Sequence, residues 1–131
     1  MTRREIREQI FQILFRIEFH QKEEFLEQLA YFEEEQDMAK GKDAAYIRQK
    51  ASAIAQKADE IDEMINAVAK GWRTKRMGKA DLAIIRLAVY EIRFDEDIPT
   101  SVAINEAVEL AKKFGTDHSS AFVNGILAKI A

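Results

Sequence analysis

Residues 47–72 read IRQKASAIAQKADEIDEMINAVAKGW, and this stretch decides the fold class. Its apolar positions follow one another at alternating distances of four and three residues without a slip. They are Ile47, Ala51, Ile54, Ala58, Ile61, Ile65, Val68 and Trp72. This spacing places them on one stripe of an α-helix. The pattern predicts either one long helix or two helices joined by a tight bend near Ala58–Glu60, with Gly71 as the terminating residue.

The segment before this stretch also has helical spacing. A first helix is expected over Ile6–Ile17, where Phe11 and Phe15 widen the apolar face. A short second helix is expected over Phe25–Phe32 and a polar connection over Glu33–Asp43.

Three more helices are expected towards the C-terminus, over Leu82–Ile92, Ile104–Phe114 and Phe122–Ile130. Pro99 separates the first two, Gly115 closes the second, and Asp117, Ser119 or Ser120 is expected to cap the last. No segment alternates with a period of two, so no strand is predicted. We therefore predict an all-α fold of six or seven helices in a single domain, residues 1–131. It should form two small bundles, at about 1–76 and 77–131.

Composition restricts the classes of function. The 131 residues include no cysteine, which excludes thiol catalysis, thiolate metal sites and disulfides. No apolar run approaches the roughly 18–20 residues of a membrane span, and no signal peptide is recognisable, so a cytoplasmic protein is expected. The net charge of −3 argues against bulk binding of nucleic acid. Basic residues nevertheless gather at Arg3–Arg7 and at Lys70–Lys79, and such a local patch can still steer RNA.

No catalytic motif emerges. The segment Gly71–Lys79 superficially resembles a phosphate loop, but six residues separate its glycines where four are needed. Its basic part, Arg73–Lys79, is interpreted as a solvated loop. The carboxylates within Asp59–Glu63 are interpreted as a solvated acidic face in preference to a metal site. We therefore expect a protein that is not an enzyme and holds no metal or cofactor.

The C-terminal half carries a set of motifs in fixed order. These are IRLAVYE at 85–91, Ile98–Pro99, VAINEAVELAKKFG at 102–115 and FVNGIL at 122–127. In order and spacing they resemble the C-terminal half of the NusB family. The N-terminal half resembles the family more loosely, through Arg3, Arg4, Arg7, Glu8, Gln12, Leu14 and Phe15. The sequence departs from the family pattern at Glu5, His118, Ala121 and Ala128.

The resemblance implies a fold of two antiparallel helical bundles. It also implies transcription antitermination, through binding of single-stranded boxA RNA from ribosomal RNA operon transcripts. The implied partners are a NusE-type ribosomal protein and the RNA polymerase antitermination complex. Two rival hypotheses are a helical protein–protein adaptor without an RNA role, and a helical domain that serves an RNA-modifying enzyme in trans.

Five residues are candidates for RNA contact. Arg3, Arg4 and Arg7 share one helix face and can pair with phosphates, although an ordinary polar helix start is the alternative. Phe122 is placed either to stack on a base or to continue the core stripe. His118 can tune binding with pH, although a surface histidine near the helix cap is the simpler interpretation.

Partner contact and two unusual helix positions complete the predictions. Because the resemblance places the helix after the basic loop near the partner, Asp81 is the candidate there, while Arg86 is expected to be satisfied internally. Phe15 on the first helix is the second partner candidate.

Asn124 and Gly125 lie inside a predicted helix, where glycine costs about 1 kcal/mol relative to alanine. A buried hydrogen bond and close helix packing are expected to explain them.

Overall fold

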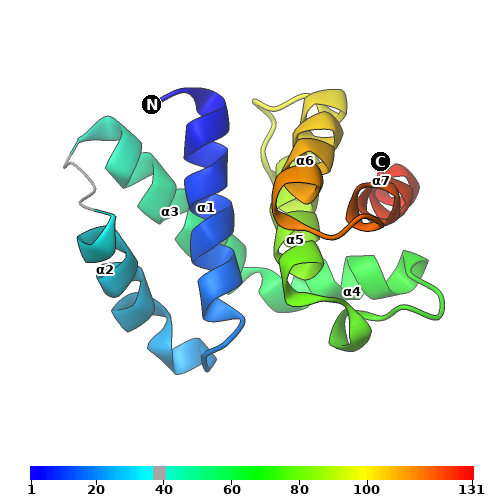
Figure 1. The fold of residues 1–131 in the computed structure, drawn as a ribbon, viewed down its shortest axis with the longest axis horizontal. Coiled ribbons are helices and arrows are strands. Elements are labelled where there is room, and N and C mark those ends of the chain that lie inside the picture. Colours follow the sequence, from blue (N-terminus) through cyan, green and yellow to red (C-terminus); the bar gives the residue numbers. More distant parts are fainter. Residues whose placement is uncertain (37–40) are drawn as a thin grey trace. The chain divides into compact units, whose positions relative to one another are not determined.

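The computed structural model describes residues 1–36 and 41–131. In these ranges the chain is helical and contains no strand, which confirms the all-α prediction (Figure 1). The helices are α1 (Arg3–Ile17), η1 (Lys22–Glu24), α2 (Phe25–Glu35), α3 (Lys42–Gln56), α4 (Ala58–Val68), η2 (Thr74–Arg76), α5 (Lys79–Phe94), α6 (Thr100–Phe114) and α7 (Ser119–Ile130). The described helices are either too short or too polar to cross a membrane.

Contacts divide the chain into two compact units, Met1–Ala55 and Gln56–Ala131. The sequence placed the boundary later, near residues 76 and 77. The difference arises from α4, which packs on α5 and α7 through its buried Ile61 and Ile65 and therefore belongs with the C-terminal helices. A turn at Lys57 interrupts the long apolar stripe, which therefore forms two helices, α3 and α4. This is the second of the two arrangements that the sequence left open.

Unit 1 is built on α1. A capping box fixes the start of this helix, because the Thr2 hydroxyl accepts from the Glu5 amide at 3.1 Å and the Glu5 carboxylate accepts from the Thr2 amide at 2.8 Å. The buried face consists of Ile10, Phe11, Ile13 and Leu14. Its width agrees with the two adjacent stripes predicted from the sequence.

The polar connection predicted over Glu33–Asp43 is shorter than expected. Helix α2 continues to Glu35, and α3 already begins at Lys42, while residues 37–40 lie outside the described part of the chain. Acidic side chains at the end of α2 form ion pairs that stabilise the extra turn of this helix. Arg16 on α1 pairs with Glu35, and Arg48 on α3 pairs with Glu33.

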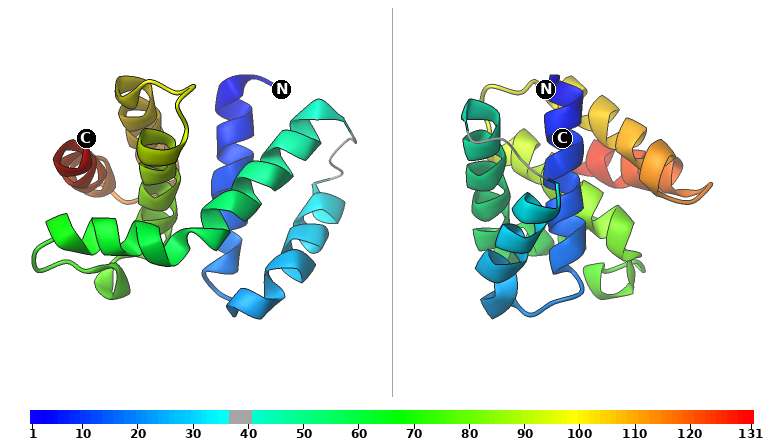
Figure 2. Two further views of the ribbon diagram at one scale, coloured as in Figure 1. Left: turned by 180° about the vertical axis from the view of Figure 1, so that it is seen from behind. Right: turned by 60° about the vertical axis from the view of Figure 1, so that its left-hand side comes forward.

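Unit 2 is organised around α5, which packs against α4, α6 and α7 (Figures 1 and 2). Seven of its apolar side chains are buried, namely Leu82, Ala83, Ile84, Ile85, Leu87, Ala88 and Val89. Near the other end of the helix, Arg93 donates to the carbonyl of Ile130 at 2.7 Å and ties α5 to the end of α7. The motif at 85–91 is therefore the core of this unit.

The junction between α6 and α7 requires glycine. A Cβ on Gly115 would lie 2.4 Å from the Ser119 hydroxyl oxygen and 2.7 Å from the Ala111 carbonyl oxygen. The predicted side-chain cap of α7 is wrong. His118 occupies the N-cap without a side-chain hydrogen bond, and the Ser119 hydroxyl instead accepts from the Thr116 amide at 2.9 Å, because that residue is buried against the junction.

Candidate functional site

Three arginines form a positive face on the first two turns of α1. Arg3 and Arg4 are exposed and Arg7 is half-buried. Their spacings of four and three residues place all three on adjacent positions of one helix side. Positive charge close to a helix N-terminus opposes the helix dipole, and repulsion between like charges adds to this, each at a cost of a few tenths of a kcal/mol. These two effects disfavour the helix, while the interactions that Arg4 and Arg7 make within the chain oppose them.

Glu5 offsets part of this cost. The hydrogen bond from the Thr2 backbone, and then that from the Thr2 side chain, hold the pKa of the Glu5 carboxyl below its ordinary value, so it stays ionised at the helix start. The residue that interrupts the basic run of the sequence is thus the acidic half of the capping box. The signal was visible as Thr2-Arg3-Arg4-Glu5, a Thr-x-x-Glu pattern.

The other two RNA candidates lie on unit 2. His118 is exposed at the N-cap of α7. Phe122 is half-buried, while Ile126 and Ile130, which continue its stripe, are 5% and 3% exposed. One side of Phe122 therefore joins the core and part of its ring remains open. The candidates are divided between the units, with the arginines on unit 1 and His118 and Phe122 on unit 2.

The explanation predicted for Asn124 and Gly125 is wrong. Both residues are exposed on α7, and nothing lies within 4 Å of the position that a Gly125 Cβ would take. Packing therefore does not require this glycine. Ala121 and Ala128, two of the departures from the family pattern, share the exposed side. The solvent face of α7 therefore carries three residues with a methyl side chain or none, Ala121, Gly125 and Ala128, together with Asn124 and Lys129.

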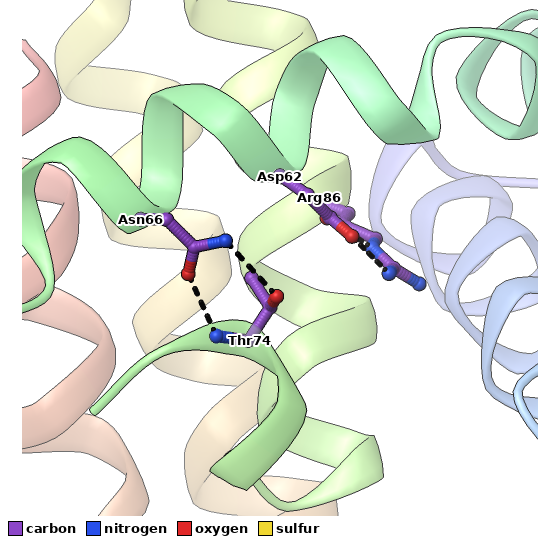
Figure 3. A network of polar contacts seen from close by, with 4 residues as sticks. All are labelled: Asp62, Asn66, Thr74 and Arg86. Atoms are coloured by element: carbon purple, nitrogen blue, oxygen red, sulfur yellow. Dashed lines mark hydrogen bonds and ion pairs between the residues drawn. The ribbon is translucent and has the colours of Figure 1, made fainter.

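The partner candidate Asp81 is half-buried in the first turn of α5, where a carboxylate complements the helix dipole. Arg86 is engaged internally, as expected. Its guanidinium forms a bidentate pair with Asp62 on α4, with the Nε–Oδ1 distance at 2.8 Å and the Nη2–Oδ2 distance at 2.7 Å (Figure 3). One member of the presumed acidic face is thus a structural tie between α4 and α5.

The second partner candidate, Phe15, lies in a ladder of rings along α1. Its ring stacks on Phe11 at 5.8 Å and meets the edge of Phe19 at 5.2 Å, measured between centroids. Phe19 is 59% exposed. The spacing of four residues between these rings is the sequence signal for this ladder, although the predicted apolar face included only Phe11 and Phe15.

Phe15 also lines a surface hollow of about 420 Å³ in unit 1. Its walls are Gln12, Phe15, Arg16, Phe19, His20, Phe32, Glu35 and Gln36. Arg16 is fixed at the rim by Gln28, whose side-chain oxygen accepts from Nε at 2.9 Å, and by its ion pair with Glu35. The hydrogen bond from Arg16 lowers the pKa of the Glu35 carboxyl. The hollow thus combines aromatic walls with a charged rim, and sequence spacing alone did not reveal it.

Comparison with known proteins assigns the chain. The family model described as the NusB family matches residues 4–131. The chain belongs to the NusB family. Among relatives named transcription antitermination protein NusB, that of Agathobacter rectalis is 56% identical over the whole of both chains. That of Lachnoclostridium phytofermentans is 49% identical over 99% of this chain and 98% of its own.

Solved structures of NusB proteins share the fold. The T. maritima NusB structure superposes with a TM-score of 0.89 at 36% identity, over 100% of this chain and 91% of that one. A structure described as antitermination factors NusB and NusE in complex with dsRNA superposes at 0.82 with 27% identity, over 98% and 94% of the two chains. NusB relatives are antitermination factors and not enzymes, which confirms the non-enzymatic function expected from the sequence.

Proposed function

We propose that this NusB-family antitermination protein binds single-stranded boxA RNA of ribosomal RNA operon transcripts together with a NusE-type ribosomal protein. The observation that carries the proposal is the likeness, over 98% of the chain, to a structure described as NusB and NusE in complex with dsRNA, in which NusB, NusE and an RNA occur together. The complex would join the RNA polymerase antitermination assembly in the bacterial cytoplasm. The exposed chemistry of both units supports this function.

The arginine face of α1 supports RNA contact. Guanidinium groups bind phosphate oxygens through two parallel hydrogen bonds, and such contacts position the RNA without selecting its sequence. Phe122 supports base contact, because an open ring face can stack on an unpaired base. His118, exposed four residues before Phe122, adds a hydrogen-bond donor beside this ring.

The hollow beside Phe15 and the carboxylate of Asp81 support contact with the protein partner. An aromatic-walled hollow of this size accommodates a bulky apolar side chain, and the removal of exposed rings such as Phe19 from water favours association. Asp81 would pair with a basic group of the partner.

The test is the affinity of a fluorescently labelled boxA strand, measured by anisotropy with and without the NusE-type protein. The strand should bind more tightly with the partner, and a scrambled strand or a boxA duplex should bind less tightly than the strand. Equal affinity with and without the partner would contradict the shared RNA site. Failure of the labelled strand to bind under either condition would contradict RNA binding itself, in favour of the adaptor without an RNA role.

The partner surface has matched control variants. Phe15→Ala and Asp81→Asn should weaken binding of the NusE-type protein. Leu26→Ala, which removes an apolar side chain that is 75% exposed outside the hollow, and Asp97→Asn, which removes an exposed carboxylate, should leave it unchanged. If the two pairs of variants behave alike, the partner binds elsewhere.

A further inference from the structure

The connection between α4 and α5 has an unusual charge pattern. From 64 to 80 the sequence contains no acidic residue and five basic ones, namely Lys70, Arg73, Lys75, Arg76 and Lys79. All five side chains are exposed. Within the described ranges, no ion pair involves Lys70, Arg73 or Lys75. Their charge is therefore available to an external anion.

This connection is fixed in shape. The side-chain oxygen of Asn66 on α4 accepts from the Thr74 amide at 2.8 Å, and its side-chain nitrogen donates to the Thr74 hydroxyl at 3.3 Å (Figure 3). Thr74 and Met77 are each 8% exposed and anchor the connection in unit 2. Gly71 turns the chain with a φ of +82°, a conformation that favours glycine. A solvated spacer, as predicted for Arg73–Lys79, would not need these contacts.

Trp72 stands on this fixed connection with 54% of its surface exposed. The sequence placed it as the last residue of the core stripe, and that prediction is wrong because α4 ends at Val68 and the chain turns before Trp72. The Arg76 guanidinium lies 5.3 Å from the centre of the ring. About half of a large aromatic surface thus stays in water beside several cations, and this half contributes no hydrophobic stabilisation to the fold.

We propose that Trp72 and its neighbouring cations form a second contact surface for single-stranded RNA. A base would stack on the open indole surface, while Arg73 and Lys75 would neutralise adjacent phosphates. Stacking on an aromatic platform within a positive surface binds single strands with little sequence preference, because every base has a π-face. The surface therefore adds affinity and leaves sequence choice to other contacts. This inference rests on the RNA-binding function proposed above.

The exposed groups favour a nucleic acid over a protein as the ligand. Among the exposed residues of 70–79 the side chains are one aromatic ring and five cations, and no aliphatic side chain accompanies them. A protein interface of this kind would normally bury an apolar core. A duplex is disfavoured as well, because its bases are already stacked on one another and cannot stack on the indole.

The chain offers a direct probe, because Trp72 is its single tryptophan. Titration of the full chain with a boxA strand, with the NusE-type protein present, should quench the fluorescence of Trp72 to saturation. Any tryptophan of the partner would be replaced by phenylalanine beforehand. Trp72→Ala should weaken binding of the labelled strand by about 5- to 150-fold, the equivalent of 1–3 kcal/mol per stacked base. Trp72→Phe should retain most of the affinity.

Tyr46→Ala is the matched control. Tyr46 is also an exposed aromatic, 44% exposed, with the Lys50 ammonium 5.5 Å from its ring centre, but it lies on α3. Its removal should leave RNA affinity unchanged. Thermal unfolding of Trp72→Ala should match that of the unaltered chain, because the indole has few buried contacts to lose.

Three results would overturn the inference in distinguishable ways. If the labelled strand binds while Trp72 fluorescence and the affinity of Trp72→Ala are unchanged, RNA binding stands and this surface has no part in it. If the NusE-type protein alone quenches Trp72 and RNA adds nothing, the surface is a protein interface. If the strand does not bind the unaltered chain, the proposed function fails and the inference fails with it.

Discussion

At the scale of single residues, Arg3, Arg4 and Arg7 stand where positive charge costs a helix stability. Arg4 and Arg7 each interact with another group of the chain, and these interactions hold their side chains in place. The capping box of Thr2 and Glu5 keeps the helix start formed despite the repulsion. The capping box stabilises the helix start and the arginines supply its positive charge, so either property can be changed by mutation without the other.

Replacement of all three arginines by alanine should change the salt dependence of RNA binding. Each phosphate contact to a single strand contributes about −0.7 to the slope of log affinity against log salt. Loss of two or three contacts should flatten that slope by roughly 1.5–2 units, a change to be measured by anisotropy titrations over a range of salt concentrations. Sequence preference should persist, because phosphate contacts do not specify bases. An unchanged slope would move the phosphate contacts to other residues.

Glu35 gives a pH-dependent contribution whose sign follows from its contact with Arg16. Because the hydrogen bond from Arg16 lowers its pKa from 4.5 in the folded chain, the ion pair stabilises the fold fully above about that pH. This contribution is lost as pH falls through the depressed folded pKa. Thermal unfolding of Glu35→Gln should therefore occur at a lower temperature than that of the unaltered chain at pH 7. The two curves should converge in acid, and a constant difference across pH would show that the carboxylate charge is irrelevant.

At the scale of elements, two glycines of unit 2 have opposite requirements. Gly115 ends α6 where any Cβ would collide with Ser119 and Ala111. Gly125 lies inside α7 with open space beyond it. The same substitution at the two positions is therefore a matched pair.

Gly125→Ala should raise stability by up to about 1 kcal/mol, because alanine is the better helix former. That gain corresponds to an increase in Tm of about 3–5 °C for a chain of this length. Gly115→Ala should instead lower Tm, since the backbone at the junction must shift to admit a methyl group. A drop in Tm for Gly125→Ala would reveal a packing role that the structure does not show. If RNA or partner binding weakens in Gly125→Ala while stability rises, the solvent face of α7 is a contact surface.

Much of the fold was predictable at this scale, because helical spacing depends only on local sequence. The positions of the helices followed from the apolar stripes, while the stripe over residues 47–72 was compatible with one long helix as well as with the two helices observed. The unit boundary did not follow from the stripes, since the packing of α4 on α5 and α7 is a long-range choice that a continuous stripe does not encode. Trp72 was misplaced for a related reason, because the stripe continues in register beyond the residue at which the helix ends.

The candidate site was less predictable than the fold. Charge and spacing identified Arg3, Arg4 and Arg7, and the structure leaves at least Arg3 and Arg4 exposed. The hollow beside Phe15 escaped detection because it combines α1 with side chains from the region of α2. The exposure of Asn124 and Gly125 was not predicted for a different reason. Sequence shows that a mid-helix glycine needs a cause, but it does not show on which side of the helix that cause lies.

At the scale of the whole molecule, the protein is a small non-enzymatic factor of the NusB family whose exposed chemistry is suited to binding. Its function would then depend on the simultaneous presence of RNA and protein partner. Two weak contacts held together by one chain bind far more tightly than either alone, because the second becomes intramolecular. A variant that lacks either contact surface should therefore lose antitermination activity while it keeps most of its folding stability.

Terminator read-through in a reconstituted transcription reaction tests the central claim most directly. The template carries boxA ahead of a terminator, and the reaction contains RNA polymerase, the other antitermination factors, the NusE-type protein and this chain. We predict that the chain increases read-through on this template, that a scrambled boxA abolishes the increase, and that the variant with Arg3, Arg4 and Arg7 replaced by alanine is impaired. Equal read-through with and without the chain, or with boxA and with its scrambled form, would contradict the account.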